Sequence, residues 1–98
     1  AVHVFEGVAD LAAAGIVPGG TINNMNHFAR HVKWDSNIAE VTRIILSDAQ
    51  TSGGLLCTVP AGEKDKIINE LKQAGINSAA HIGNCLDRGE GLIFVKRS

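Results

Sequence analysis

Aromatic residues are scarce in this 98-residue sequence, which has three Phe, one Trp and no Tyr. That supply is small for a domain that has to bury its own hydrophobic core unaided. The length excludes two independent cores, because single domains mostly run to roughly 100–200 residues. The sequence starts at Ala1 without an initiator Met, so we expect one small domain or a piece of a longer protein.

The sequence also lacks long hydrophobic runs and an excess of charge of either sign. No run approaches the roughly 18 apolar residues that a membrane span needs, so we expect no membrane insertion. Nine Lys and Arg stand against ten Asp and Glu, and no basic patch of the kind that follows a phosphate backbone stands out. We therefore expect no nucleic-acid partner. Hydrophobic residues make up 45% and charged residues 19%, which excludes an intrinsically disordered chain.

Cysteine is rare too, and the two present, Cys57 and Cys85, are too few for a disulfide scaffold. Cys57 lies inside the apolar run 55–59, which favours a small buried residue in a strand over a reactive thiol. The first residues show no basic stretch followed by an apolar one, so we expect no signal peptide. Nothing in the sequence argues for export, and we expect a cytoplasmic protein.

Hydrophobic periodicity and the positions of Gly and Pro predict four helices and three strands. The predicted helices cover 5–14, part of 23–31, 35–47 and 61–74, and the predicted strands cover 55–59, 79–82 and 92–95. Gly15 and Gly75 are placed to end helices. This order predicts an α/β fold with helices packed on a small mixed sheet. Because three short strands make an incomplete sheet, we expect an upstream segment or a second chain to supply further strands.

The polar segment from Asp48 to Gly54 is the first candidate for chemistry. It places a carboxylate, a carboxamide, two hydroxyls and two glycines before an apolar run. Glycine allows a backbone to come close to a ligand, and hydroxyls and amides can bind phosphate oxygens or metal-bound water. The alternative is a helix-to-strand turn whose polar side chains satisfy its own backbone, and composition alone favours this alternative.

A second polar segment, 18–24, reads Pro-Gly-Gly-Thr-Ile-Asn-Asn. It does not match a P-loop, because no Gly-Lys-Ser/Thr follows, nor the dinucleotide fingerprint, because no strand precedes it. On the residues alone, a loop followed by a helix with Thr21 as N-cap is favoured. His27 and His31 have a helical spacing that can hold zinc, but further ligands are missing, which favours two partly exposed helix residues.

Together the two segments resemble a known family. Gly-Ile-Val-Pro-Gly-Gly-Thr at 15–21 with Asn24, followed by Ser-Asp-Ala-Gln-Thr-Ser-Gly-Gly-Leu-Leu at 47–56, resembles the C-terminal part of selenophosphate synthetase, also called selenide, water dikinase. That family carries Pro-Gly-Gly-Thr-Xaa-Xaa-Asn and then Asp-Pro-Gln-Thr-Ser-Gly-Gly-Leu-Leu. Ala49 stands where the family usually has Pro. The helix and strands predicted for the tail also resemble the family's ending.

The resemblance implies that residues 1–98 form a single, incomplete C-terminal α/β domain in the superfamily of this enzyme and the ATP-dependent purine-ring synthase. The family uses ATP and Mg²⁺ to convert selenide and water into selenophosphate, AMP and phosphate. Its reactive Cys or selenocysteine, the partner Lys and the metal-binding Asp residues lie outside the part that this sequence resembles. The resemblance therefore implies an N-terminal ATP-binding domain as partner, a homodimer, and an isolated chain without catalytic residues, metal ligands or a tightly bound cofactor.

The resemblance also implies which residues lie beside the phosphate site of the complete enzyme. They are Gly19, Gly20, Thr21, Asn24, Asp48, Gln50, Thr51, Ser52, Gly53 and Gly54. We expect the last two glycines to allow a close backbone approach, and the hydroxyls of Thr51 and Ser52 to face the domain cleft. For Asp48, fixing the loop by accepting backbone N–H bonds is favoured over binding Mg²⁺, because one carboxylate alone makes a poor Mg²⁺ site.

Two alternatives stay open beside a selenophosphate synthetase fragment. One is a stand-alone binding or assembly module that has kept the fold and lost the chemistry. The other is a fragment of a different member of the superfamily, such as a thiamine-monophosphate kinase. The Thr-Ser-Gly-Gly motif occurs loosely across the superfamily, whereas the Pro-Gly-Gly-Thr motif with Asn24 favours the selenium enzyme.

Overall fold

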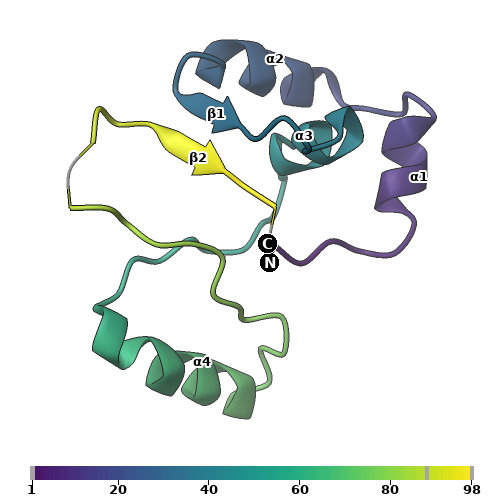
Figure 1. Ribbon diagram of the computed structural model, residues 1–98. Helices are drawn as coiled ribbons and strands as arrows, with labels where there is room; N and C mark the ends of the chain where they lie inside the picture. Colours follow the sequence, from purple (N-terminus) through teal and green to yellow (C-terminus); the bar gives the residue numbers. More distant parts are fainter. Residues whose placement is uncertain (1, 88, 98) are drawn as a thin grey trace. The chain divides into compact units, whose positions relative to one another are not determined.

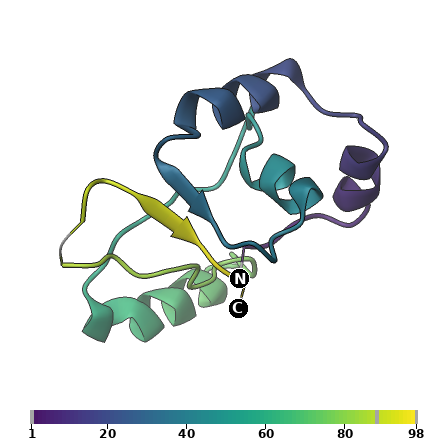
Figure 2. The same cartoon turned by 45° about the horizontal axis from the view of Figure 1, so that its top comes forward.

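The computed structural model describes residues 2–87 and 89–97, and these divide into two compact units. The larger unit holds residues 5–53 together with residues 89–97, and the smaller unit holds residues 2–4 and 54–87. Figures 1 and 2 show the helices and strands of each unit. We describe each unit by itself.

The larger unit combines three helices with a two-stranded sheet. Its elements are α1 (Val8–Ala13), α2 (Gly19–Phe28), β1 (Val32–Trp34), α3 (Glu40–Leu46) and β2 (Ile93–Val95). The helix α3 packs against both α1 and α2 (Figures 1 and 2). The strands run parallel, with Val32 opposite Ile93 and Trp34 opposite Val95. The α/β class that the sequence predicts is therefore confirmed.

Backbone hydrogen bonds extend the parallel pairing at both ends. The amide of Ile93 donates to the carbonyl of His31 at 2.8 Å, and the amide of Asp35 donates to the carbonyl of Val95 at 2.9 Å. Beyond β1, the amide of Ile38 donates to the carbonyl of Asp35 at 3.1 Å and closes a turn. This turn explains why α3 begins at Glu40 and not at the predicted position near residue 35.

Two helices end at the glycines that the sequence predicts. Gly15, after α1, has a φ of 79°, and Gly75, after α4 (Lys64–Gln73), has a φ of 92°. In both cases the residue that follows the glycine donates to the carbonyl five residues back, as from Ile76 to Leu71 at 2.9 Å. This is the bonding pattern of a Schellman cap, which needs the left-handed conformation that glycine adopts without a Cβ clash.

The smaller unit contains one α-helix, α4, preceded by the short 3-10 helix η1 (Ala61–Glu63). Pro60 is the N-cap of η1. Proline suits the start of a helix because the N–H group that it lacks would have no partner within the helix there. Along α4, Ile67 and Ile68 are half-buried, whereas the charged residues Asp65, Lys66 and Glu70 are exposed. The predicted helix 61–74 is confirmed, with its first turn wound as a 3-10 helix.

The strands of the sequence prediction are only partly right. Ile93–Val95 is a strand, but 55–59 and 79–82 carry no regular structure. Leu55 is 93% exposed and Cys57 is exposed, so the predicted burial of Cys57 is wrong. An apolar run becomes a strand only where another strand pairs with it, and the sheet of the described residues consists of β1 and β2.

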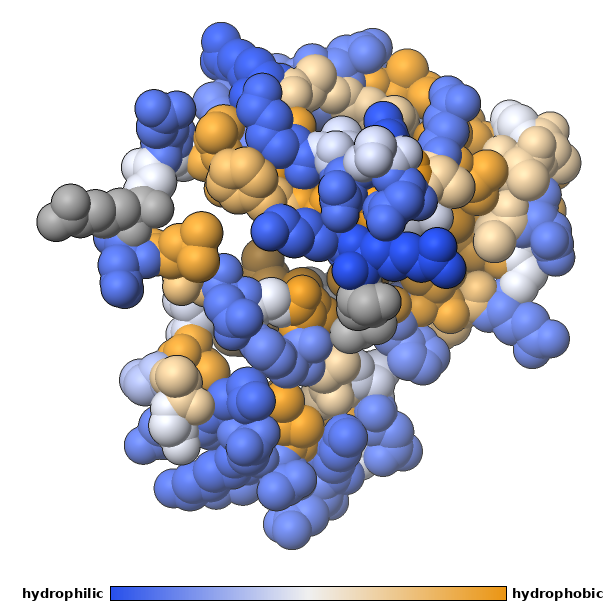
Figure 3. All heavy atoms as spheres, in the orientation of Figure 1, coloured by the Kyte–Doolittle hydropathy of each residue, from blue (hydrophilic) through white to orange (hydrophobic). Residues whose placement is uncertain are grey.

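Very little of the described chain is buried. Ala12, at 9% exposure, is the buried hydrophobic residue, and Thr21, at 0%, is the buried polar one. Large hydrophobic side chains such as Phe5, Ile16 and Leu56 are more than half exposed, and Figure 3 shows orange hydrophobic atoms across the face in view. No helix of the described residues is long and apolar enough to cross a membrane. The expectation that further strands complete the sheet stays a prediction.

Candidate functional site

The two polar segments that the sequence singles out meet inside the larger unit. The Oγ1 atom of Thr21, in the first turn of α2, donates to Oδ1 of Asp48, directly after α3, at 2.6 Å. Thr21 is fully buried and Asp48 half-buried. A hydrogen bond this short to a carboxylate is charge-assisted and stronger than one between neutral groups. It links the two segments across 27 positions of sequence.

This bond also corrects the predicted role of Thr21 as N-cap. The N-cap of α2 is Pro18, and the helix already includes Gly19 and Gly20. The Thr21 side chain therefore lies inside the first turn and is free to bond outside its own helix. The predicted helix 23–31 consequently begins earlier than expected and ends at Phe28.

A second hydrogen bond joins the same two elements. Asn24 follows Thr21 by three residues and so lies on the same face of α2. Its Nδ2 donates to the carbonyl of Ser47, the C-cap of α3, at 3.1 Å. The hydroxyl of Ser47 in turn donates to the carbonyl of Arg43 at 2.8 Å. The C-terminal end of α3 is thus held to α2 at two neighbouring points.

The glycine pair at the start of α2 lets the second segment approach closely. A Cβ built on Gly20 would lie 3.0 Å from the Cβ of Ala49, whereas one on Gly19 would meet no described atom within 4 Å. Gly20 is therefore the glycine that this packing requires. Gly19 serves the helix start instead, directly after Pro18.

The loop after α3 is held by its own side chains as well. Nε2 of Gln50 donates to Oδ2 of Asp48 at 3.1 Å. The side chain of Gln50 then covers Gly53, because a Cβ built there would lie 3.1 Å from the Cβ of Gln50. Each oxygen of the Asp48 carboxylate thus has one side-chain donor, whereas the sequence predicted backbone N–H donors.

Thr51 and Ser52 form the exposed bend between Gln50 and Gly53. Their hydroxyls are therefore accessible to solvent on the larger unit. Gly54 belongs to the smaller unit, and a Cβ built there would meet no described atom within 4 Å. Of the two glycines predicted to allow a close approach, the structure shows a close neighbour for Gly53 only.

The described residues do not fit a Mg²⁺ or zinc site. They contain no group of three His, Cys, Asp or Glu that could hold a metal ion. Asp48 already accepts hydrogen bonds at both oxygens. The ring of His27 stacks edge-on against Phe28 with centroids 4.7 Å apart, and Nε2 of His31 accepts from Nε of Arg30 at 3.0 Å. The two histidines are thus engaged separately.

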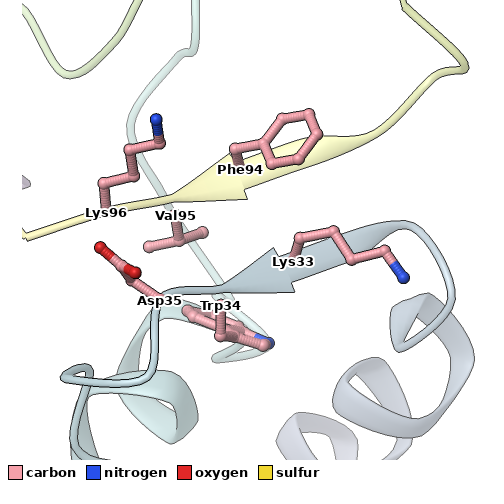
Figure 4. Close-up of a pocket in the computed structure, with 6 residues that line it drawn as sticks. All are labelled: Lys33, Trp34, Asp35, Phe94, Val95 and Lys96. Atoms are coloured by element: carbon pink, nitrogen blue, oxygen red, sulfur yellow. The ribbon is translucent and has the colours of Figure 1, made fainter.

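A shallow hollow of about 120 Å³ lies along the two strands (Figure 4). It is lined by Lys33, Trp34, Asp35, Phe94, Val95 and Lys96. Figure 4 shows the ammonium groups of Lys33 and Lys96 pointing away from each other, so they do not converge on one ligand. Sequence reasoning missed this feature because β1 was not predicted. Its Trp34 ring also lies 5.9 Å from the guanidinium carbon of Arg43, a cation–π contact.

Comparisons with known proteins give a consistent result. The chain is 36% identical over 96 residues to a selenide, water dikinase of Carboxydothermus hydrogenoformans and 39% identical over 96 residues to one of Haemophilus ducreyi; each match covers 98% of this chain and 27% of the relative. It is 42% identical over 72 residues to a selenide, water dikinase of Myxococcus xanthus, covering 74% of this chain and 20% of that relative.

No protein-family model and no solved structure matches the chain. The chain spans about a quarter of the length of the curated relatives it matches. The two polar segments that carry the resemblance are the ones that Thr21 and Asp48 bring together. The chain belongs to the selenide, water dikinase family and corresponds to part of the C-terminal region of its members.

Proposed function

We propose that this chain is the C-terminal part of a selenide, water dikinase, an enzyme that converts ATP, selenide and water into selenophosphate, AMP and phosphate. Residues 1–98 then form a single, incomplete C-terminal domain. Support comes from several relatives of that name, matched over nearly the whole chain. The bond between Thr21 and Asp48 is the observation that carries the proposal, because it makes one site from two segments distant in sequence.

In the complete enzyme this site lies beside the phosphate groups. Gly20, Thr21, Asn24, Asp48, Gln50 and Gly53 shape it, Gly19 begins the helix that carries Thr21, and Thr51 and Ser52 supply exposed hydroxyls. A hydroxyl donates to phosphate oxygens and also accepts from ordered water, so an exposed Thr-Ser pair on a braced loop suits an anionic ligand. The chain itself contributes shape and hydrogen-bond donors to the reaction, and we assign it no nucleophile and no metal ligand.

The rest of the active site belongs to a partner. We propose the N-terminal ATP-binding domain of the same enzyme, which binds ATP and Mg²⁺, within a homodimer. The exposed apolar residues Phe5, Ile16 and Leu55 support a partner, because a small monomer rarely exposes so much apolar surface. Both cysteines are free and exposed, which suits the reducing cytoplasm where we place the enzyme.

A chimera tests the proposal. This chain replaces the matching quarter of the Carboxydothermus hydrogenoformans relative, and AMP release is measured with ATP and Mg²⁺, with and without selenide. We expect selenide-dependent AMP release from the chimera and none from the isolated chain. A folded, dimeric chimera without such activity would contradict the proposal. ADP release with thiamine monophosphate in place of selenide, where one phosphoryl group passes from ATP to the substrate, would instead support a different member of the superfamily.

Thr51→Val in this chimera tests the role of the exposed hydroxyls. Valine keeps the shape of threonine and removes its hydrogen-bonding group, so turnover should fall while the melting temperature stays within about 1 °C. The matched control is Thr58→Val, since Thr58 is also exposed but lies outside the bend. If Thr51→Val lowers the melting temperature and spares turnover, the bend is a structural turn and does not contact ligand.

A further inference from the structure

We propose that Asp48 is a positioning carboxylate and not a Mg²⁺ ligand, and that the buried hydroxyl of Thr21 sets the shape of the 48–53 loop through it. The proposal rests on the proposed function for its catalytic consequence. Its structural part stands on the hydrogen bonds and packing of the larger unit alone. It divides the site into residues that hold the loop and residues that meet the ligand.

The carboxylate of Asp48 is occupied from two directions. Thr21 donates to Oδ1 at 2.6 Å and Gln50 donates to Oδ2 at 3.1 Å. Mg²⁺ demands near-octahedral geometry at about 2.0–2.1 Å and a carboxylate that can turn toward it. To serve the ion, Asp48 would have to rotate away from a charge-assisted bond to a buried partner. The described residues place no group of further His, Cys, Asp or Glu beside it to share the ion.

Burial gives Thr21 its control over the loop. With none of its surface exposed, the Thr21 hydroxyl loses its hydrogen-bond acceptor if Asp48 moves away, and leaving a buried hydroxyl unsatisfied is unfavourable. The bond therefore selects one position of Asp48. Gln50 bonds the other oxygen and covers Gly53. Thr21 thus contacts Asp48, Asp48 contacts Gln50, and Gln50 contacts Gly53. This series of contacts extends from one end of the bend to the other.

The exposed residues Thr51 and Ser52 lie between the last two members of that series. They are flanked by Gln50, which bonds Asp48, on one side and by Gly53, which packs against Gln50, on the other. A substitution at Thr21 should therefore shift the hydroxyls of Thr51 and Ser52 although Thr21 does not contact either of them. Thr21 and Asp48 act on the ligand only through these neighbours, which makes them positioning residues.

Nuclear magnetic resonance of the labelled, isolated chain tests the structural part without any activity. Thr21→Val should shift the side-chain amide signals of Gln50 and the backbone amides of residues 48–53. Thr21→Ser keeps the hydroxyl and should leave them near their original positions. The matched control is Thr42→Val on the exposed side of α3, which should leave the loop signals unchanged. If Thr21→Val changes only signals of α2, the proposal is wrong.

The active chimera tests the metal part through Asp48→Asn. An asparagine can accept from Thr21 and donate to Gln50 once the Gln50 amide turns over, so both bonds of a positioning residue survive. We expect the Mg²⁺ concentration for half-maximal rate to change less than about twofold. A lost ligand would raise it by roughly 10-fold or more, and that result would overturn the proposal. If Thr21→Val shifts the loop signals in the isolated chain but the chimera is inactive, only the proposed function is overturned.

Discussion

Gly20 and Ala49 pack so closely that a Cβ on the glycine would lie 3.0 Å from the Cβ of the alanine. Gly20 lies within α2 and Ala49 in the loop after α3. The contact fixes how near the two polar segments come to each other. It also makes Gly20 distinguishable from its neighbour Gly19, which has no described atom in that direction within 4 Å.

Gly20→Ala and Gly19→Ala should therefore differ in stability. Alanine in place of glycine favours a helix by up to about 1 kcal/mol. Gly19→Ala should therefore raise the free energy of unfolding by part of this amount. Gly20→Ala should lower the free energy of unfolding, because Ala49 has to move to make room for the new Cβ and this cost exceeds the gain in helix propensity. Thermal unfolding followed by circular dichroism measures both variants. Equal melting temperatures would contradict the close contact.

Asn24→Ala should destabilise the larger unit by about 1 kcal/mol, the usual net contribution of one hydrogen bond. The change removes the donor to the carbonyl of Ser47. Asn26→Ala is the matched control, because Asn26 is exposed on the same helix and gains the same helix propensity. Chemical denaturation gives the difference between the two variants. A difference near zero would show that water replaces the Asn24 amide without cost.

Gly75→Ala should destabilise α4 by about 1 kcal/mol or more, because an L-residue is strained at the φ of 92° found there. Gly62→Ala is the control, since Gly62 precedes α4, has no positive φ and has open space around its Cα. Amide hydrogen exchange across residues 64–76 reports the effect. Protection that falls equally in both variants would contradict a special conformation at Gly75.

The isolated chain should self-associate through its exposed apolar segment 54–59. Leu55 is 93% and Leu56 79% exposed, and unpaired extended segments without charge invite pairing with another chain. Leu55→Asp should lower the association measured by sedimentation velocity across a concentration series. It should leave the melting temperature unchanged, because the leucine is exposed.

Leu86→Asp is the control for non-specific hydrophobic association, since Leu86 is 74% exposed elsewhere in the smaller unit. It should reduce association less than Leu55→Asp. An isolated chain that stays monomeric at high concentration would contradict the prediction. Equal effects of both substitutions would show that the association is non-specific.

Local signals in the sequence predicted the helices and their ends better than the strands. The apolar stripe of α4 and the glycines at 15 and 75 depend on neighbours within a few residues, and all three predictions are confirmed. The strand β1 was missed because Val32–Trp34 is only three residues long. Its strand character comes from a partner about sixty residues away, which no local pattern reports.

The candidate site shows the same division. The composition of both polar segments marks them as candidates, and the family resemblance predicts that they belong to one site. The hydrogen-bond partners of Asp48 could not be predicted from the sequence. A carboxylate near a helix end can bind backbone amides, side chains or metal ions, and the local sequence pattern does not distinguish these cases. Only the approach of α2 to the end of α3 shows that Thr21 supplies the donor.

The parallel pairing of β1 with β2 has a consequence for the order of folding. During synthesis, β1 leaves the ribosome long before Ile93–Val95, and the smaller unit's residues 54–87 are made in between. Pairing distant segments makes contact order high and folding slow. The sheet of the larger unit therefore cannot form until β2 has been made, and loss of β2 alone would leave β1 without a partner while α4 could still form.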